Sequence, residues 1–150
     1  MKTKKICLAC SAGGHLTEIL IIKRYLGIKN NFFFIINKKI KFKENKVYYV
    51  SHGIINFNLI KNFYEIFKIF LKEKPKIIIS TGASIAFPVA IVGKYFFNAK
   101  IIFIETVTRV KKPSRTGKIL YWISDIFFFQ WKELKKFYPK GILLNVLDLI

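Results

Sequence analysis

The chain has 150 residues, 53% of them hydrophobic, so it has the length of one domain and enough apolar side chains to form a core. This composition excludes an intrinsically disordered protein. The 27 basic and 8 acidic residues give a net charge of +19, which favours a polyanionic partner: nucleic acid, an anionic membrane or a phosphorylated substrate. The alternative is that codon usage in an AT-rich genome accounts for part of the lysine excess.

The apolar runs are all interrupted, for example by Lys94 and Asp125, and none reaches the roughly 18 residues of a membrane-spanning helix. The N-terminal apolar run is short for a secretory signal, so we interpret it as the first strand of a cytoplasmic protein. Cys7 and Cys10 have the spacing of a redox or metal-binding pair. In a strand, however, their side chains would point to opposite faces, and we expect reduced, buried thiols.

Short β-branched or aromatic runs alternate with longer segments of helical periodicity, which is typical of a parallel sheet covered by helices. The expected strands are Lys5–Cys10, Asn31–Asn37, Lys46–Val50, Lys76–Ser80, Lys100–Glu105 and Ile126–Gln130, and a weaker pattern at Gly141–Leu144 would add a seventh. The expected helices are Leu16–Leu26, Asn58–Glu73, Ile85–Phe97 and Thr116–Ile123. We therefore predict one domain, residues 1–150, with an α/β fold: a single Rossmann-like, doubly wound parallel sheet whose ligand site lies at the carboxyl ends of the strands.

Helix 58–73 has the clearest amphipathic pattern. Apolar residues such as Ile66 and Phe70 recur at helical spacing, while Lys61, Lys68 and Lys72 take the other side. Pro75 is expected to end the helix. Its lysines, together with the basic cluster at 109–118, are candidate contacts for anionic lipid headgroups.

Two glycine-containing loops each lie between a strand and a helix: Ser11-Ala12-Gly13-Gly14-His15 and Ser80-Thr81-Gly82-Ala83-Ser84. Glycine lets the backbone approach a ligand closely, and a helix start presents free N–H groups to an anion. Neither loop matches the dinucleotide or P-loop pattern, which disfavours an oxidoreductase or NTPase. Plain turn chemistry is the alternative for either loop alone, whereas two such loops at one sheet edge could converge on a diphosphate.

A third candidate site begins with Glu105, at the end of the fifth expected strand, and continues into a basic segment that contains Arg109, Lys111, Lys112 and Arg115. A carboxylate in this position could be an ion-paired structural group. It could also contact a sugar hydroxyl or hydrogen-bond a catalytic group.

With these three loops the sequence resembles the Alg14-like family, including bacterial capsule and exopolysaccharide proteins of the PssD and Cps14F type, and more distantly the N-terminal half of MurG. The matching stretches are SAGGHLTEIL at 11–20, STGASIAFPVAIVGKYF at 80–96, IETVTRVKKPSRTGKILYWISDIFFFQW at 104–131 and KFYP at 136–139.

The resemblance implies the acceptor-binding N-terminal half of a GT-B glycosyltransferase that is split into two polypeptides. With a donor-binding partner, such a subunit transfers a sugar from a nucleotide sugar, expected to be UDP-linked, to a polyprenyl-diphosphate-linked saccharide in capsule, exopolysaccharide or O-antigen synthesis. We expect no cofactor and no activity from this chain alone. The eukaryotic relatives carry an N-terminal membrane helix that this sequence lacks, so attachment would be peripheral, at the cytoplasmic face of the membrane.

Site residues follow from the resemblance by position. It implies catalytic roles for His15 and Glu105. It places the acceptor diphosphate at the two glycine loops, and we assign binding of this group to Ser11, Gly13, Gly14, Thr81, Gly82 and Ser84. Arg109, Lys111, Lys112 and Arg115 are candidates for contact with the acceptor or the membrane. One position departs from the MurG pattern, which has an Asn where this chain has Val107.

His15 could act as the base that takes the proton of the acceptor hydroxyl, and a structural role is the alternative. His52, followed by Gly53, is expected to be a turn residue. Only two Asp are present, so a DxD metal site is excluded and a metal-dependent GT-A mechanism is disfavoured. A second Rossmann domain does not fit into 150 residues. We therefore expect the donor site on a partner that covers apolar surface around residues 141–147.

Two functions from other classes compete with this one. A nucleic-acid-binding module is disfavoured, because the aromatic residues fall within strands and helix faces and no recognition motif appears. A non-catalytic scaffold that anchors a glycosyltransferase at the membrane is not separable from a co-catalytic subunit by sequence, and activity of the His15→Ala complex would discriminate them.

Overall fold

The computed structural model describes residues 4–37, 40, 44, 46–50 and 57–149. Their strands form one sheet in the order β3-β2-β1-β4-β5-β6-β7, with parallel pairing throughout. The strands are β1 Ile6–Cys10, β2 Phe32–Ile36, β3 Val47–Tyr49, β4 Ile77–Ser80, β5 Lys100–Ile104, β6 Ile126–Phe129 and β7 Ile142–Leu143. The parallel sheet, including its seventh strand, is therefore confirmed.

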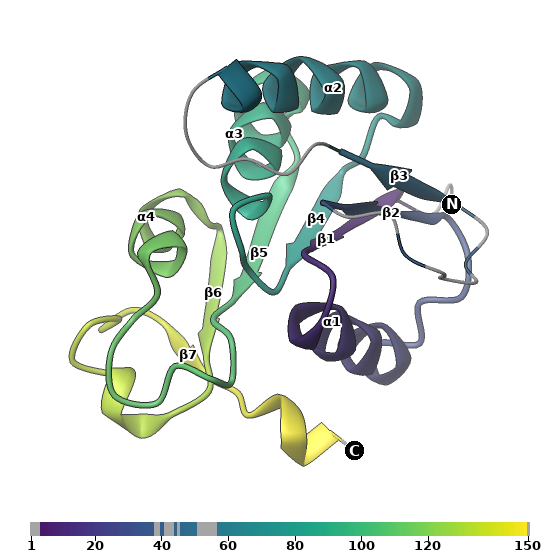
Figure 1. Ribbon diagram of the computed structural model, residues 1–150. Coiled ribbons are helices and arrows are strands. Elements are labelled where there is room, and N and C mark those ends of the chain that lie inside the picture. Colours follow the sequence, from purple (N-terminus) through teal and green to yellow (C-terminus); the bar gives the residue numbers. More distant parts are fainter. Residues whose placement is uncertain (1–3, 38–39, 41–43, 45, 51–56, 150) are drawn as a thin grey trace.

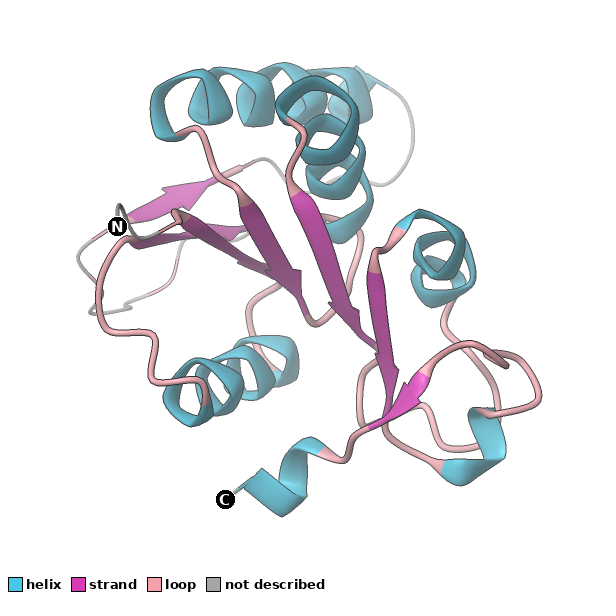
Figure 2. Cartoon of the chain, turned by 180° about the vertical axis from the view of Figure 1, so that it is seen from behind, coloured by secondary structure: helices cyan, strands magenta, loops and turns pink. Residues whose placement is uncertain are grey.

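Helices cover both faces of the sheet, as Figures 1 and 2 show. The helices are α1 Gly14–Tyr25, α2 Phe57–Glu73, α3 Ala86–Phe97 and α4 Arg115–Ile123, followed by the short 3-10 helices η1 Lys132–Leu134 and η2 Val146–Leu149. One apolar cluster packs beneath α1 and η2, and the other beneath α2, α3 and α4. This two-sided cover makes the sheet doubly wound. No helix within the described ranges combines the length and the apolar character needed to cross a membrane.

Strand β1 shows how the sheet separates its two cores. Cys7 and Ala9 belong to the cluster under α2–α4, whereas Leu8 and Cys10 belong to the cluster under α1. Both cysteines are free and buried. Burial raises the pKa of the Cys7 thiol and raises that of Cys10 to about 12, so neither is a reactive thiolate near neutral pH. The expectation that the two thiols are buried on opposite faces of the sheet is confirmed.

Helix α2 has the amphipathic arrangement that its sequence predicts. Ile66 and Phe70 are fully buried, while Lys61, Lys68 and Lys72 are exposed. The helix ends at Glu73, two residues before Pro75, and Lys74 takes a left-handed conformation with φ 48°. A proline forbids the helical conformation at the preceding residue, which explains this end point.

Most element boundaries differ from the expected ones by one or two residues. Helix α1 begins at Gly14 rather than at Leu16, because the Gly13 carbonyl already accepts hydrogen bonds from the N–H groups of Leu16 and Thr17. Glu105 lies just beyond β5, which ends at Ile104. The expected turn at His52 and Gly53 lies outside the described residues.

At the amino ends of the strands, the buried carboxylate of Glu73 is held by charged partners. Lys5 and Lys46 form ion pairs with it, each at 2.8 Å, and the Tyr48 hydroxyl donates a hydrogen bond to it. Burial alone would raise the pKa of Glu73, but these partners outweigh burial and lower it to about 2. This end of the sheet is therefore closed by a fully charged cluster at neutral pH.

At the carboxyl ends the chain order changes direction. From β1 the sheet continues to β2 and β3 on one side, and to β4, β5, β6 and β7 on the other. In open α/β sheets, ligands bind in the crevice outside the strand ends at such a switch point. The functional site should therefore lie beyond the ends of β1 and β4.

Candidate functional site

A cleft of about 710 Å³ lies at this switch point. Its walls come from Ser11 and His15 after β1, Asn37 after β2, residues 82–84 after β4, and residues 105, 106, 108, 109 and 112–116 after β5. The volume lies within the range of small-molecule sites, which is roughly 300–1,000 Å³. The structure thus brings all three predicted loops together around one cavity.

His15 lies in the first turn of α1 and is fixed by the loop that follows β4. Its Nδ1 is 2.7 Å from the Thr81 carbonyl oxygen, and the Thr81 hydroxyl donates a hydrogen bond of 2.8 Å to the His15 carbonyl. Because a carbonyl only accepts hydrogen bonds, Nδ1 carries the hydrogen, and Nε2 of the neutral ring is left as an acceptor. The side chain is 25% exposed and lines the cleft.

Gly82 is required beside this imidazole. Its φ of 113° lies in a region that other residues rarely adopt, and a Cβ atom there would lie 3.2 Å from Cε1 of His15. The glycine in the second loop therefore makes room for the ring of the first loop.

Glu18 is the second ionisable group at His15. It follows His15 by three positions on α1, and its carboxylate oxygen Oε2 lies 3.7 Å from His15 Nδ1. The other oxygen, Oε1, accepts hydrogen bonds from the Val107 N–H at 2.8 Å and the Thr106 hydroxyl at 3.1 Å. The residue is only 5% exposed, and burial raises its pKa, while the two hydrogen bonds and His15 oppose that rise. Glu18 thus links the first loop to the third.

Glu105 is also a cleft residue, but its carboxylate is occupied within the chain. Oε2 accepts hydrogen bonds from the Ser114 N–H, the Ser114 hydroxyl and the Tyr138 hydroxyl at 3.0, 3.1 and 2.7 Å. Its side chain is 1% exposed, and a Cβ on Gly117 would lie 2.0 Å from Oε2. Its hydrogen-bond donors are uncharged, so the expected ion pair is not what holds it. In this structure Glu105 orders the loop between β5 and α4.

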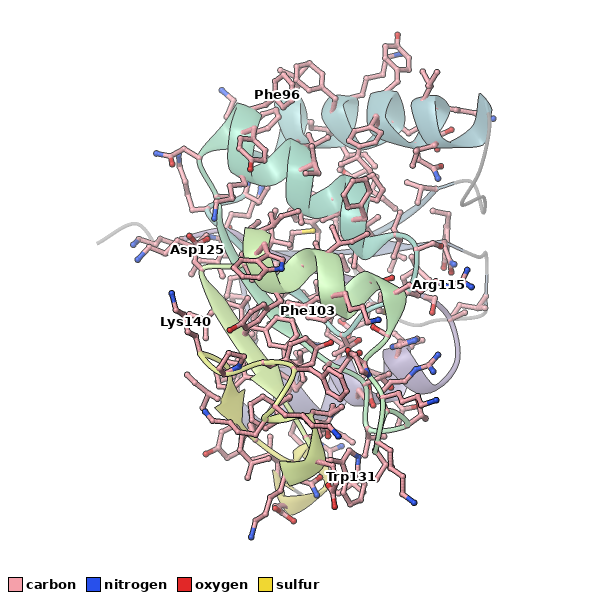
Figure 3. The ribbon with its side chains drawn as sticks, turned by 90° about the vertical axis from the view of Figure 1, so that its left-hand side faces the viewer. Phe96, Phe103, Arg115, Asp125, Trp131 and Lys140 are labelled. Atoms are coloured by element: carbon pink, nitrogen blue, oxygen red, sulfur yellow. The ribbon has the colours of Figure 1, made fainter. Side chains whose placement is uncertain are left out.

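The remaining predicted residues fall into three groups. Ser11, Gly82 and Ser84 line the cleft, as do the cations Arg109, Lys112 and Arg115. Gly13, Gly14 and Lys111 are exposed nearby without lining it, and Thr81 is buried, with its side chain directed to His15. Figure 3 shows Arg115 at the start of α4, where the loop between β5 and α4 ends. None of the ion pairs within the described part of the chain involves the three cleft cations, which outnumber Glu105, the one carboxylate that lines the cleft with them.

Sequence reasoning missed Glu18 and Asn37, and it included Thr106 in the third loop without assigning it a contact. Asn37 is buried at the end of β2, and its side chain accepts a hydrogen bond from the Ala12 N–H. A signal for Glu18 was present, because residues three apart on a helix share a face and His15 stands three positions before it. No comparable spacing pointed to Thr106 or Asn37, whose positions depend on the pairing of distant strands.

Comparison with known proteins places the chain in a family. Residues 45–147 match the family described as "Oligosaccharide biosynthesis protein Alg14 like". The human UDP-N-acetylglucosamine transferase subunit ALG14 is 25% identical over 178 aligned positions, covering 93% of this chain and 81% of the human protein. The Candida albicans protein of the same name is 37% identical over 83 positions, covering 49% of this chain and 38% of the Candida protein.

Solved structures agree on the fold. MurG of Acinetobacter baumannii superposes with a TM-score of 0.73 at 12% identity, over 93% of this chain and 44% of that one. A UDP-GlcNAc 2-epimerase from Methanocaldococcus jannaschii gives a TM-score of 0.72 at 16% identity, over 97% of this chain and 47% of the epimerase chain. This chain thus spans less than half the length of these two enzymes and corresponds in fold to one half of each. On the family match, the chain belongs to the Alg14-like family of oligosaccharide biosynthesis proteins.

Proposed function

We propose that this chain is the acceptor-binding subunit of a two-part glycosyltransferase that transfers N-acetylglucosamine from its UDP-linked form. The relatives that it matches are named as subunits of a UDP-N-acetylglucosamine transferase, which supports both the donor and the existence of a second subunit. The acceptor would be a polyprenyl-diphosphate-linked saccharide, and the pathway would be synthesis of a capsule, an exopolysaccharide or an O-antigen.

The observation that carries this proposal is a cationic cleft with a free imidazole nitrogen at its wall. Arg109, Lys112 and Arg115 line it without carboxylate partners, and such an arrangement favours a polyanion such as a diphosphate. The loop residues Ser11, Gly82 and Ser84 add small, polar or backbone surface for the phosphate oxygens. His15 lines the same space, and because its Nδ1 is bonded to Thr81, Nε2 is the nitrogen that we assign to the acceptor.

The chemistry is a displacement at the anomeric carbon of the donor sugar. The acceptor hydroxyl oxygen forms the new C–O bond, the bond between the sugar and the UDP phosphate oxygen breaks, and UDP leaves with the electron pair. His15 Nε2 takes the hydroxyl proton as the acceptor oxygen attacks. A general base of this kind contributes roughly 10²- to 10⁴-fold to a rate.

The donor site would come from the partner. The chain corresponds to less than half of the two-domain enzymes that share its fold, so we propose that a second polypeptide faces the carboxyl edge of the sheet. Part of the apolar surface expected for the partner is present: Ile142, Leu143 and Leu147 are exposed, whereas Gly141 and Val146 are buried. Exposed apolar residues gathered in one segment are typical of protein contact sites.

Peripheral membrane association would bring the cleft to its lipid-linked acceptor. On α4, Trp122 is 81% exposed and Ile119 is also exposed, next to the cations Arg115 and Lys118. Helix α2 combines the exposed lysines with exposed Ile60, Tyr64 and Leu71. Each basic residue near an anionic surface contributes about 1 kcal/mol. Sedimentation with anionic and neutral vesicles tests this, and equal binding to both, or to neither, would contradict the electrostatic account.

Reconstitution tests the proposed function. The purified chain and its candidate donor-binding partner, separately and together, are given UDP-N-acetylglucosamine and a polyprenyl-diphosphate-linked sugar. We expect turnover only when both polypeptides are present. Robust turnover by this chain alone would contradict the two-part assignment, and full activity of a His15→Ala complex would favour the scaffold function instead.

A further inference from the structure

We propose that Glu18 is the positioning residue for His15, and that its carboxylate stabilises the imidazolium that forms when Nε2 takes the acceptor proton. This inference rests on the proposed function and assigns a role to a residue that the proposed mechanism does not otherwise use. In the sequence analysis, Glu105 was the candidate carboxylate partner of the catalytic group, and we assign that role to Glu18.

The carboxylate of Glu18 has one satisfied oxygen and one free one. Oε1 accepts from Val107 and Thr106, whereas Oε2 is buried and has no hydrogen-bond partner among the residues that the structure describes. The free oxygen is the one that faces His15, at 3.7 Å from Nδ1. Because an unpaired buried oxygen is costly, its position beside a titratable ring indicates a functional arrangement.

The distance indicates which interaction operates. At 3.7 Å, Oε2 and Nδ1 are too far apart for a hydrogen bond, and the Nδ1 hydrogen is already given to the Thr81 carbonyl at 2.7 Å. The carboxylate therefore acts on the imidazole through its charge, while Thr81 sets the tautomer. Opposite charges about 4 Å apart in a partly buried site attract, so a carboxylate at this distance is placed to stabilise positive charge that develops on the ring during proton transfer.

Glu18 is also held rigidly enough to do this. Its position on α1, three residues after His15, places both side chains on one face of the helix. The hydrogen bonds from the Val107 N–H and the Thr106 hydroxyl fix Oε1 to the third loop. The ring is thus clamped between the loop after β4 and a carboxylate anchored on the loop after β5.

Other ionisable groups surround the pair. Glu105 acts on Glu18 from the end of β5 and opposes its ionisation, and Cys10 lies close enough at the end of β1 for Glu18 to disfavour its thiolate. Arg109, Lys112 and Arg115 face the same cleft. The ionisation of Glu18 is therefore influenced by Glu105 as well as by His15.

The first test uses Glu18→Gln in the complex with its partner. The amide keeps the shape and one acceptor oxygen but removes the charge. We expect kcat to fall about 10- to 100-fold, which is part of the general-base contribution, with KM changed less than about 2-fold. The acidic limb of the pH–rate profile should move to lower pH. Glu65→Gln, the same change on α2 away from the cleft, is the matched control. It should leave kcat, KM and the pH–rate profile unchanged.

The second test needs no activity. Two-bond ¹H–¹⁵N spectra of the isolated chain follow the His15 imidazole through a pH titration, with His52→Gln used to assign the two rings. In Glu18→Gln we expect the ring to take its second proton at a lower pH than in the wild-type chain, while the neutral ring keeps its hydrogen on Nδ1.

The two readouts separate the possible failures. If the wild-type complex shows no transfer, the proposed function is wrong, and the titration still decides whether Glu18 and His15 are coupled. If Glu18→Gln leaves the titration of the ring unchanged, or lowers activity only in proportion to a lower melting temperature, Glu18 is a structural residue and the inference is overturned.

Discussion

Buried carboxylates lie at both ends of the sheet, one paired with two lysines and the other beside an imidazole. At the amino end, Glu73 is surrounded by Lys5, Lys46 and Tyr48, and its pKa is lowered to about 2. At the carboxyl end, Glu18 keeps one oxygen free beside His15, and burial raises its pKa. A carboxylate that is fully paired contributes stability, whereas one left partly unpaired next to an imidazole is typical of a functional site.

Glu105 adds a third case to this comparison. It lies at the functional end of the sheet, yet its hydrogen bonds resemble those of a structural group, since its carboxylate accepts from Ser114 and Tyr138. Location at a strand end therefore does not establish function by itself.

The largest effect is expected from His15→Ala. Loss of the proposed base should lower kcat of the reconstituted complex by at least about 100-fold. Because the ring is partly exposed and its loss removes one hydrogen bond, to Thr81, and the contact with Glu18, the melting temperature should change little. Lys29→Ala, in the exposed loop after α1, is the control and should retain full activity. Wild-type turnover by His15→Ala would show that His15 is not the catalytic base.

Glu105→Gln should act mainly on stability. A carboxylate accepts on both oxygens, whereas an amide turns one of them into a donor that faces the Ser114 or Thr106 N–H. The free energy of unfolding should fall by about 1–3 kcal/mol, measured by urea denaturation. Because Glu105 is only 1% exposed, Glu105→Ala should also be destabilised. Glu133→Gln, at an exposed position, is the control.

Equal stability of Glu105→Gln and the wild-type chain, combined with lost transfer, would instead return Glu105 to the catalytic group. The same experiment therefore decides whether Glu105 is a structural or a catalytic carboxylate.

Glu73→Gln should have the smallest effect at neutral pH and a distinct pH dependence. The pKa of Glu73 is lowered in the folded chain to about 2, from an ordinary value of about 4.5, so its contribution is present above that ordinary value and is lost as the pH falls toward 2. At pH 7 the free energy of unfolding of the variant should be lower by about 1–2 kcal/mol. The loss is modest because the lysine partners are partly exposed.

In thermal denaturation, the difference between wild type and Glu73→Gln should therefore shrink between about pH 4.5 and pH 2. Transfer activity per folded molecule should be unchanged. A constant difference across this pH window would show that the ion pairs contribute nothing measurable.

The sequence predicted the fold well because its signals are local. Strand runs such as Ile77–Ser80 and the amphipathic pattern of α2 depend on residues close together in the chain, and both are confirmed. The cleft was predicted in outline, since parallel strands bring their following loops to one edge. What could not be predicted were contacts such as Tyr138 with Glu105 or Thr106 with Glu18, which join residues 33 and 88 positions apart.

The most direct test of the acceptor assignment is calorimetric titration of the isolated chain. A short-chain prenyl-diphosphate-linked sugar and UDP-N-acetylglucosamine both carry a diphosphate, so their comparison separates acceptor recognition from general anion binding. We expect the acceptor analogue to bind at least about 10-fold more tightly, a difference of about 1.4 kcal/mol, and to lose that advantage in Lys112→Ala/Arg115→Ala. Tighter binding of UDP-N-acetylglucosamine, unaffected by these substitutions, would contradict the assignment of the cleft to the acceptor.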